Sequence, residues 1–281
     1  MTVRSEILPS WCPGCSNFVI LNAFDSVIDE LSRDGKIDVR KLIVNSGIGC
    51  HGKIFDYLNI SGVNALHGRS IPLSLGIKLA NKDLKVVCFV GDGDTYAEGL
   101  EHLIHASRYN IDVKVFVHNN ETFALTTGQS APTSKKGFKS KVRPEGERVE
   151  PLDPILLLLA SNASFVARAY ALDQESLKQI FKEALLHKGF AVVDILQPCV
   201  SFNDFRNEVR DRLMKIENPL KSREEAISFH FQSIKDGKIP IGVYFKEERK
   251  TFEEVEQIEK VYSRLKRKID LEKLIEDFVI Q

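Results

Sequence analysis

The stretch from Lys85 to Gln129, KVVCFVGDGDTYAEGLEHLIHASRYNIDVKVFVHNNETFALTTGQ, decides the fold. It contains two apolar runs, 85–90 and 113–118, that are typical of buried strands, with a helix-length segment between them. A right-handed crossover places two such strands side by side in a parallel sheet. Asp92 and Asn120 follow these strands, so their side chains should meet at the carboxyl edge of the sheet. The sequence therefore predicts an α/β protein with a ligand site at this edge.

The residues at this edge suit a magnesium ion and a diphosphate. Asp92 offers a carboxylate oxygen, Asn120 an amide oxygen and Thr122 a backbone carbonyl, which are ligand types that Mg²⁺ accepts beside phosphate oxygens. The helix expected from Thr95 adds favourable partial charge for an anion. The plainer interpretation is a tight turn that caps a helix, but the paired Asn residues after the second strand make it less favoured. A dinucleotide site is disfavoured because the turn is GDGD without GxGxxG.

The rest of the chain alternates between helical and strand patterns. We expect a mostly parallel sheet flanked by helices, with residues 1–203 as one domain and 204–281 as a C-terminal extension packed on that domain or on a partner subunit. The loop 129–154 is polar and basic, so we expect it to be exposed and to order only on binding. Helices are expected at 17–31, 71–80, 95–110, 154–161 and 174–187 and from about residue 251, and strands at 40–45, 85–90, 113–118, 191–196 and 239–245.

Composition limits the classes of partner. The 281 residues contain 39 Lys and Arg against 39 Asp and Glu, so no excess charge favours nucleic acid or an anionic membrane surface. The start of the chain lacks the apolar run of a signal peptide, and the run LLLL from Leu156 is too short to span a bilayer. We therefore expect a cytoplasmic protein that binds neither nucleic acid nor membranes.

The five cysteines point to a metal or redox site rather than to a disulfide framework. Cys12 and Cys15 form a CxxC motif, and Cys50 and Cys199 each follow a turn-type sequence, so four thiolates can converge. Four thiolates suit a [4Fe-4S] cluster or a structural zinc ion, and their spacing does not separate the two. A thioredoxin-like disulfide site is disfavoured because too little chain precedes Cys12. Cys88 lies in the apolar run VVCFV and is expected in the core.

Six motifs together resemble a known family. They are WCPGC at 11–15, GIGC at 47–50, HGR at 67–69, GDGD at 91–94, NNETFALTTGQSAPTS at 119–134 and HKGFAVVDILQPC at 187–199. GDG followed by NN about thirty residues later is the thiamine-diphosphate signature, and the set in this order resembles the β subunit of 2-oxoacid:ferredoxin oxidoreductases. The resemblance covers most of the chain and weakens beyond about Asn203.

The resemblance implies a set of cofactors and site residues. Thiamine diphosphate would be held with Mg²⁺ on Asp92, Asn120 and Thr122. One [4Fe-4S] cluster would be bound by the cysteines that match the family's ligands. His102, His105 and His118 have no motif support, and we expect them at a helix surface or a strand end. The implied cluster ligands are Cys12, Cys15, Cys50 and Cys199, and the implied cofactor contacts are Ile48, Gly49, Cys50, His51, His67, Gly68, Gly93, Asp94, Leu125 and Thr126.

The resemblance also implies an activity and partners. The reaction would be the oxidative decarboxylation of a 2-oxoacid, pyruvate or 2-oxoglutarate, to acyl-CoA and CO₂, with electrons passed through the cluster to ferredoxin. An α subunit, or α and γ subunits, would supply the glutamate for the cofactor's aminopyrimidine ring, in a dimer of heterodimers. Two alternatives stay open here. One is a non-redox thiamine-diphosphate decarboxylase or synthase with structural zinc, and the other is a non-catalytic assembly subunit.

Overall fold

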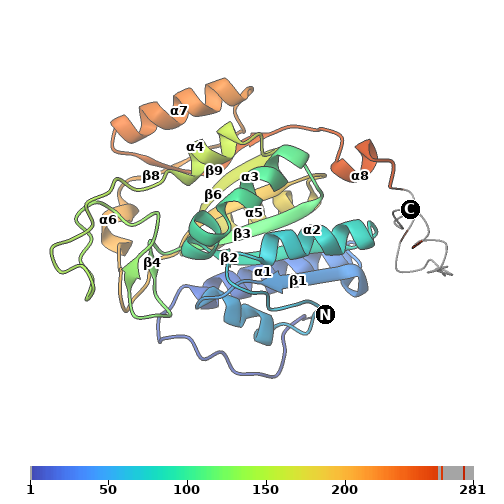
Figure 1. Ribbon diagram of the computed structural model, residues 1–281, viewed down its shortest axis with the longest axis horizontal. Helices are drawn as coiled ribbons and strands as arrows, with labels where there is room; N and C mark the ends of the chain where they lie inside the picture. Colours follow the sequence, from blue (N-terminus) through green and yellow to red (C-terminus); the bar gives the residue numbers. More distant parts are fainter. Residues whose placement is uncertain (1, 259–260, 262–274, 276–281) are drawn as a thin grey trace.

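The computed structural model describes residues 2–258, 261 and 275, and its centre is a seven-stranded sheet (Figure 1). The strand order is β1-β2-β3-β7-β6-β9-β8. The first five strands in this order are parallel, β9 runs antiparallel to β6, and β8 is parallel to β9. The strands are β1 (Leu42–Ser46), β2 (Lys85–Gly91), β3 (Val113–Asn119), β6 (Phe165–Tyr170), β7 (Ala191–Leu196), β8 (Leu213–Lys215) and β9 (Ile239–Lys246).

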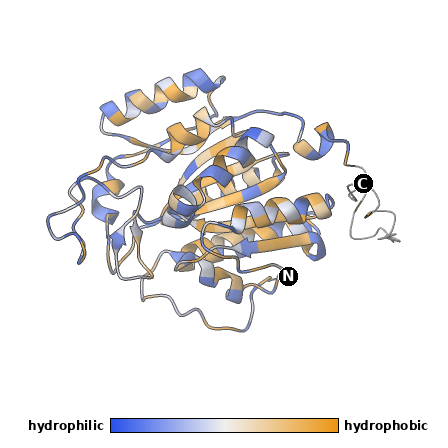
Figure 2. Ribbon diagram, viewed as in Figure 1, coloured by the Kyte–Doolittle hydropathy of each residue, from blue (hydrophilic) through white to orange (hydrophobic). Residues whose placement is uncertain are grey.

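Helices cover both faces of the sheet, and the alternation of strand side chains explains why. In β2, Val87 and Phe89 pack into one core, whereas Val86, Cys88 and Val90 pack into the other. Figure 2 shows the resulting apolar strands between helices that are polar on their outer sides. The first core is covered by α1 (Asn17–Arg33) and α5 (Gln174–Leu186), and the second by α2 (Ser70–Ala80), α3 (Leu100–Tyr109), α4 (Pro154–Ala160) and α7 (Arg223–Lys235).

The order of the strands creates a crevice at the carboxyl edge. The chain crosses the sheet in one direction through β1, β2 and β3, and in the other direction from β6 to β7. The strand order therefore reverses between β3 and β7, and open α/β sheets bind ligands at such a point. The hairpin of β4 (Thr122–Phe123) and β5 (Gln129–Ser130) follows β3 directly and lies at this edge.

The expected mostly parallel sheet with flanking helices is confirmed, with two local corrections. Helical geometry begins directly after β2, and a π-helical turn, Asp94–Glu98, precedes α3, so the helix starts earlier than the expected Thr95. The loop 129–154 is largely irregular, as expected, but Ala131, Thr133 and Ser134 are buried rather than exposed. They are buried because their polar groups bond inward to the site edge.

The sequence patterns missed β4, β5, β6, β8 and α7. They also missed three short helical segments, α6 (Arg206–Arg210) and the 3₁₀ segments Val39–Lys41 and His51–Tyr57, the first of which takes up the start of the strand expected at 40–45. In β6 a buried arginine, Arg168, interrupts the apolar run that marks a strand. The expected strand at 239–245 is confirmed as β9, which joins the main sheet beside β6. A short helix, α8 (Phe252–Val255), follows it, and the helices expected beyond 258 lie almost entirely outside the described residues. The division of the chain at residue 203 stays a prediction.

No helix in the described part of the chain combines the length and apolar character that a bilayer crossing needs.

Candidate cofactor and cluster sites

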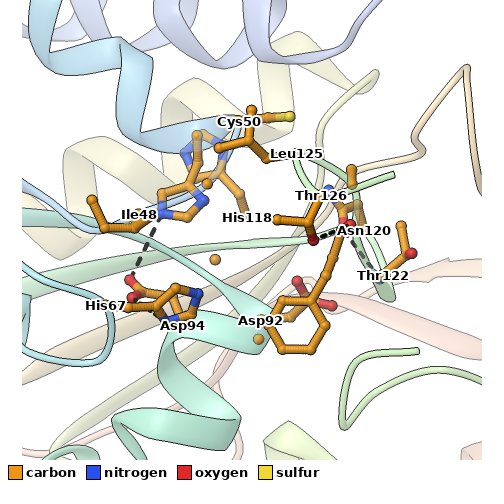
Figure 3. Close-up of a pocket in the computed structure, with 16 residues that line it drawn as sticks. Ile48, Cys50, His67, Asp92, Asp94, His118, Asn120, Thr122, Leu125 and Thr126 are labelled. Carbon is orange, nitrogen blue, oxygen red and sulfur yellow. Dashed lines mark hydrogen bonds and ion pairs between the residues drawn. The ribbon is translucent and has the colours of Figure 1, made fainter. Parts of the chain in front are cut away.

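A cavity of about 430 Å³ lies at the carboxyl ends of the first three strands, where the sequence predicted the cofactor (Figure 3). We call it the cofactor cavity. Gly91 of β2 pairs with His118 of β3, so the residues that follow these strands emerge side by side. Its lining includes nine of the ten predicted cofactor contacts, Ile48, Gly49, Cys50, His51, His67, Gly93, Asp94, Leu125 and Thr126, and all three predicted metal ligands, Asp92, Asn120 and Thr122.

The predicted metal ligands form a buried, oxygen-rich corner of the cofactor cavity. Asp92 is 3% exposed, and Thr133 Oγ1 donates a hydrogen bond to its Oδ2 at 2.8 Å. Burial raises the pKa of the Asp92 carboxyl to about 7, while Thr133 opposes that rise. Asn120 Oδ1 accepts the Thr122 N–H at 3.1 Å, which holds the two residues together. A divalent cation bound here would stabilise the ionised form of Asp92.

The described residues contain no group of three or more His, Cys, Asp and Glu side chains arranged around one metal position. The predicted magnesium site is of another kind, because it has one carboxylate, one amide and one backbone carbonyl.

Asp94 is the polar centre of the opposite wall. Its Oδ1 accepts the Gly68 N–H at 2.6 Å and lies 3.2 Å from His67 Nδ1, while Oδ2 lies 3.7 Å from His51 Nε2. Gly68 is the one predicted contact outside the lining, and this bond gives it an indirect role. Gly47 must lack a side chain, because a Cβ there would collide with the Asp94 carboxylate. The GIGC, HGR and GDGD motifs therefore meet at Asp94.

Several buried polar atoms around the cofactor cavity lack a hydrogen bond to any described residue. They are His51 Nε2, His67 Nδ1, Asp94 Oδ2 and His118 Nε2. Buried polar groups in proteins are nearly always hydrogen-bonded, so a cavity with such atoms in its walls suits a polar ligand. Gly93 faces the ring of Phe123, where a Cβ would clash, so the start of the helix lies close to the hairpin. The residues present fit a diphosphate bound through a metal ion at Asp92.

His118 is the main residue of the site that the sequence analysis missed. We expected it at a strand end without a role; it does lie near the end of β3, but it is 1% exposed and lines the cofactor cavity. Burial, and then the nearby His51, lower its pKa well below the usual value. Strand alternation contained the signal, because residues two apart in a strand share a side and His118 is two residues before Asn120. Phe123, Ala124 and Thr133 were also missed.

The four predicted cluster cysteines line a second cavity of about 640 Å³, which we call the cluster cavity. Cys12 and Cys15 belong to one turn, in which the Cys15 N–H donates to the Cys12 carbonyl at 3.0 Å. Trp11 Nε1 donates to the Cys50 carbonyl at 2.6 Å. The cysteines in its lining are Cys12, Cys15, Cys50 and Cys199, whereas Cys88 is buried in the core, as expected.

Two polar side chains around the cluster cavity donate hydrogen bonds to cysteine sulfur atoms. Ser201 Oγ donates to Cys12 Sγ at 3.4 Å, and Gln197 Nε2 donates to Cys15 Sγ at 3.8 Å. Burial raises the pKa of the Cys50 thiol to about 11, and the neighbouring Cys199 and Cys15 add to the rise. Sulfur atoms that repel one another's negative charge in this way would be stabilised as thiolates by bound cationic iron. The residues present therefore fit a cluster held by four thiolates.

The two cavities are neighbours. Cys50, Asn120, Ala124 and Leu125 line both of them, so these residues form the wall between the cofactor cavity and the cluster cavity.

Comparison with known proteins agrees with this geometry. Residues 47–195 match the family of the C-terminal TPP-binding domain of thiamine pyrophosphate enzymes. The chain is 40% identical to the β subunit of 2-oxoacid:ferredoxin oxidoreductase 1 of Aeropyrum pernix, over 86% of this chain and 79% of the relative. It is 38% identical to the 2-oxoglutarate synthase subunit KorB of Archaeoglobus fulgidus, over 92% of each chain.

A solved structure is also similar. It is the 2-oxoglutarate:ferredoxin oxidoreductase of Magnetococcus marinus, determined with 2-oxoglutarate, coenzyme A and succinyl-CoA bound. The TM-score is 0.87 at 30% identity, and the match covers 98% of this chain and 94% of that chain. These similarities favour neither the non-redox enzyme nor the assembly subunit. The chain belongs to the family of 2-oxoacid:ferredoxin oxidoreductase β subunits.

Proposed function

We propose that this chain is the subunit that carries thiamine diphosphate and one [4Fe-4S] cluster in an enzyme that converts a 2-oxoacid and coenzyme A to acyl-CoA and CO₂. The electrons pass through the cluster to ferredoxin. The observation that carries the proposal is the shared wall: Cys50 lines the cavity of the thiamine-diphosphate domain and also the cavity with the other three cysteines. The shared wall would therefore give a short path for electron transfer from the cofactor to the cluster.

Different residues of the cofactor cavity would bind different parts of the cofactor. Asp92, Asn120 and the Thr122 carbonyl would hold Mg²⁺, which accepts such oxygen ligands beside phosphate oxygens. Gly93 and Asp94, at the start of the helix, line the same cavity, and the N-terminus of a helix favours an anion. Thiamine diphosphate supplies the carbanion and the electron sink of the decarboxylation. Ile48, Leu125 and Thr126 line the cavity and would be available to contact the bound cofactor.

The cluster cavity supplies thiolates and hydrogen bonds to their sulfur atoms. Cys12, Cys15, Cys50 and Cys199 bind the four irons, while Ser201 and Gln197 donate to two of the sulfurs. Among the described residues the four cysteines line one cavity but are not gathered around a single metal position, which suits a cluster better than a zinc ion, since zinc needs four sulfurs about 2.3 Å from one centre. Free cysteines in this number also fit the reducing cytoplasm, where we place the protein.

A partner subunit completes the active site. Two apolar side chains of the cavity lining are partly exposed, Leu125 at 47% and Ile48 at 38%, and Leu66, the residue before His67 of that lining, is 77% exposed. We assign this surface to the α subunit, alone or with a γ subunit, which would exclude water and supply the glutamate for the aminopyrimidine ring. The assembly would be a dimer of heterodimers. The substrate class is the 2-oxoacids, pyruvate or 2-oxoglutarate, in keeping with the 2-oxoglutarate bound by the similar Magnetococcus marinus enzyme.

Anaerobic co-purification with the partner subunit tests the proposal. We expect a brown complex with thiamine diphosphate, iron and acid-labile sulfide, whose visible absorption bleaches when 2-oxoacid and coenzyme A are added together. A colourless protein that contains zinc and no sulfide would contradict the redox assignment. A complex that retains no thiamine diphosphate would contradict the catalytic one.

A further inference from the structure

Asp194 is a buried carboxylate that the proposed function does not use. It lies in β7, where its neighbours Val193 and Ile195 pack into the first core, so its own side chain points into the second. Asp194 is 0% exposed. A charge in an apolar layer is costly, and a protein in which apolar residues replace a buried ion pair is often as stable or more stable. Stability alone therefore does not account for Asp194.

The Asp194 carboxylate accepts hydrogen bonds from three other elements. Tyr96 Oη and Asn119 Nδ2 both donate to Oδ1, at 3.0 Å each, and Arg168 Nε of β6 donates to Oδ2 at 3.0 Å. Arg168 compensates the negative charge of the carboxylate. Tyr96 belongs to the π-helical turn after β2, and Asn119 is the last residue of β3. One oxygen atom of Asp194 therefore joins the segments at the carboxyl ends of β2 and β3.

These two segments carry the proposed metal ligands. Asp92 follows β2 directly, and Asn120 and Thr122 belong to residues 119–122 at the end of β3, which we call the ligand turn. Between these two ligands lies Glu121, whose φ of 57° is in the left-handed region. A residue other than glycine keeps such a conformation only where the surrounding contacts hold it there.

The side-chain amide of Asn119 holds the ligand turn. Its Oδ1 accepts the Glu121 N–H at 3.3 Å and lies 3.0 Å from Thr133 Oγ1, and that hydroxyl also donates to Asp92 Oδ2 at 2.8 Å. A carboxylate only accepts hydrogen bonds and a backbone N–H only donates them, so one orientation of the amide satisfies both Asp194 and Glu121. Asp194 therefore fixes which way the Asn119 amide faces.

On the basis of the proposed function, we propose that Asp194 is a positioning residue of the metal site, which sets the spacing between Asp92 and the ligand turn. Tyr96 ties the start of the helix after Asp92 to Oδ1 of Asp194, and Asn119 ties the ligand turn to the same atom. Asp194 does not line the cofactor cavity, so it acts through these two residues.

The expected effect is a loss of preference for Mg²⁺ over Ca²⁺. Mg²⁺ requires near-octahedral ligands at short distances, whereas Ca²⁺ accepts longer and more flexible ones. A change in the spacing between Asp92 and the ligand turn should therefore weaken thiamine diphosphate binding with Mg²⁺ more than with Ca²⁺. Removing the partner of a metal ligand typically lowers metal affinity about 10–100-fold, and we expect the lower end because Asp194 acts at one remove.

Tyr96→Phe is the decisive variant, because it keeps the buried ring and removes one hydrogen bond to Asp194. We expect thiamine diphosphate affinity to fall about fivefold with Mg²⁺. With Ca²⁺ the fall should be less than about twofold, because that ion tolerates the altered spacing.

Asp194→Asn tests the same atom from the other side. An amide has one oxygen, which the Arg168 charge attracts, so its NH₂ group faces Asn119 and forces that amide to turn round. Affinity with Mg²⁺ should fall about tenfold. This variant also leaves Arg168 without its anionic partner, which lowers the free energy of unfolding. Tyr96→Phe decides the question if Asp194→Asn does not fold.

Isothermal titration calorimetry of the complete complex, freed of cofactor and divalent metal by dialysis, measures thiamine diphosphate affinity at saturating Mg²⁺ and separately at saturating Ca²⁺. Tyr57→Phe is the matched control. Tyr57 is 3% exposed, its hydroxyl accepts the Ser10 N–H at 2.9 Å, and it lines neither cavity. It loses the same group as Tyr96→Phe and should bind the cofactor like the parent with either ion.

Three results would overturn the inference: parental affinity in Tyr96→Phe, equal losses with the two ions, or an equal loss in Tyr57→Phe. A parent complex that binds no thiamine diphosphate with either ion would instead contradict the proposed function.

Discussion

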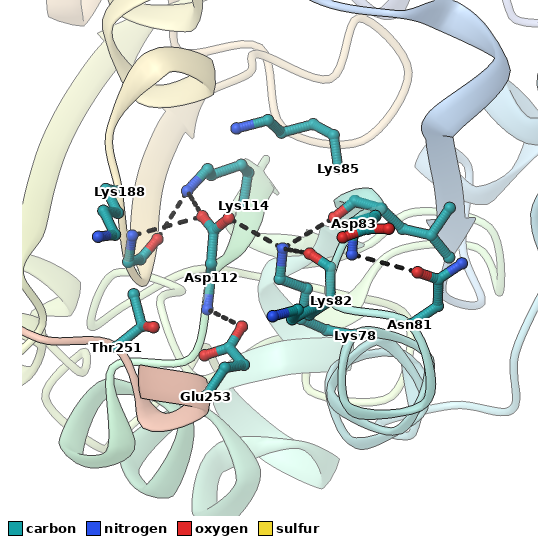
Figure 4. A network of polar contacts seen from close by, with 12 residues as sticks. Lys78, Asn81, Lys82, Asp83, Lys85, Asp112, Lys114, Lys188, Thr251 and Glu253 are labelled. Atoms are coloured by element: carbon teal, nitrogen blue, oxygen red, sulfur yellow. Dashed lines mark hydrogen bonds and ion pairs between the residues drawn. The ribbon is translucent and has the colours of Figure 1, made fainter. Parts of the chain in front are cut away.

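The two ends of strands β2 and β3 differ in how fully their buried polar groups are hydrogen-bonded. At the carboxyl end, Asp94 and His118 have buried atoms that bond to no described residue. At the amino end, the ammonium and carboxylate groups at the centre of the network in Figure 4 are hydrogen-bonded, and Glu253 Oε2 at its margin is the atom there that bonds to no described residue. A protein tolerates buried polar atoms without partners only where something else satisfies them. The carboxyl end is therefore a place for ligands, and the amino end is a structural anchor.

Lys114 and Lys78 make the amino-end network complete. Lys114 is fully buried, and its ammonium group donates to Asp112 and, at 2.7 Å each, to the carbonyls of His187 and Gly189. Lys78 donates to Asp112 at 3.0 Å and to two backbone carbonyls at 2.8 Å. Each ammonium group has three hydrogens and three acceptors. No capacity is left for a ligand, so this network serves to join α2, β3 and the turn before β7.

The largest effect is expected from Asp112→Ala at the amino end. The change leaves the Lys78 and Lys114 charges buried beside each other without their carboxylate, and removing one partner of a buried ion pair costs about 3–5 kcal/mol of unfolding free energy. Urea denaturation measures the loss. The surface variant Glu145→Ala should stay within about 0.5 kcal/mol of the parent. If the folded fraction of Asp112→Ala also loses thiamine diphosphate affinity, the separation between the two ends is wrong.

Asp92→Ala should act at the carboxyl end alone. Without its carboxylate the metal loses an anionic ligand, so we expect thiamine diphosphate affinity to fall more than about hundredfold, or roughly 2.7 kcal/mol. Isothermal titration calorimetry with Mg²⁺ present measures the thiamine diphosphate affinity. The visible absorption of the cluster should persist, because Asp92 does not line the cluster cavity.

Cys199→Ala is the reciprocal of Asp92→Ala. It should abolish the iron absorption and spare cofactor affinity, because Cys199 lines only the cluster cavity of the two. If both variants behave like the parent, the assignment of both sites fails.

Acid should lower the free energy of unfolding that Asp112 contributes at the amino end, within a defined range of pH. The carboxyl of Asp112 is itself partly desolvated by burial, but the nearby Lys114 and Lys78 outweigh that effect and hold its pKa well below the usual value of about 3.9. The stabilisation from Asp112 is therefore fully present above about pH 5 and is lost progressively as the pH falls through the unfolded pKa toward the folded one. The slope is at most about 1.4 kcal/mol per pH unit for this group.

Urea denaturation between pH 5 and pH 2 measures this loss, with Asp112→Asn as the comparison. The variant should show a flatter dependence on pH than the parent in that range. Identical slopes would mean that other carboxylates, not Asp112, carry the acid sensitivity.

The sequence predicted the carboxyl end far better than the amino end, for a physical reason. Strand order and a right-handed crossover place Asp92 beside Asn120 wherever these motifs occur, so topology alone was enough. At the amino end, Lys78 bonds to Asp112, and Lys114 bonds to the carbonyls of His187 and Gly189, which are far away in the chain. In the middle of the sheet, Arg168 of β6 pairs with Asp194 of β7, 3.0 Å apart at Nε and Oδ2. Nothing local in the sequence marks such partners. The strand β6 was missed for the same reason, because Arg168 looks polar until its partner is seen.

The smallest effect is expected at Thr133, which does not bind the metal itself but bonds to the proposed metal ligand Asp92. Thr133 has one hydroxyl hydrogen and two acceptors within reach, Asp92 Oδ2 at 2.8 Å and Asn119 Oδ1 at 3.0 Å. A charge-assisted bond is the stronger, so the ionisation of Asp92 that accompanies metal binding should turn the hydroxyl toward the carboxylate. Thr133→Val keeps the shape and removes this bond, at a cost of about 1 kcal/mol, or about fivefold in thiamine diphosphate affinity.

Thr133→Ser restores the hydroxyl and should restore most of the affinity, as measured by the same titration at fixed Mg²⁺. A Val variant with the affinity of the parent would mean that the hydroxyl stays on Asn119 when the metal binds. The carboxylate at 92 would then be oriented by the backbone of the helix start alone. The distinction matters because Thr133 belongs to the loop 129–154, and a measured role would make the buried beginning of that loop part of the cofactor site rather than a connection between β5 and α4.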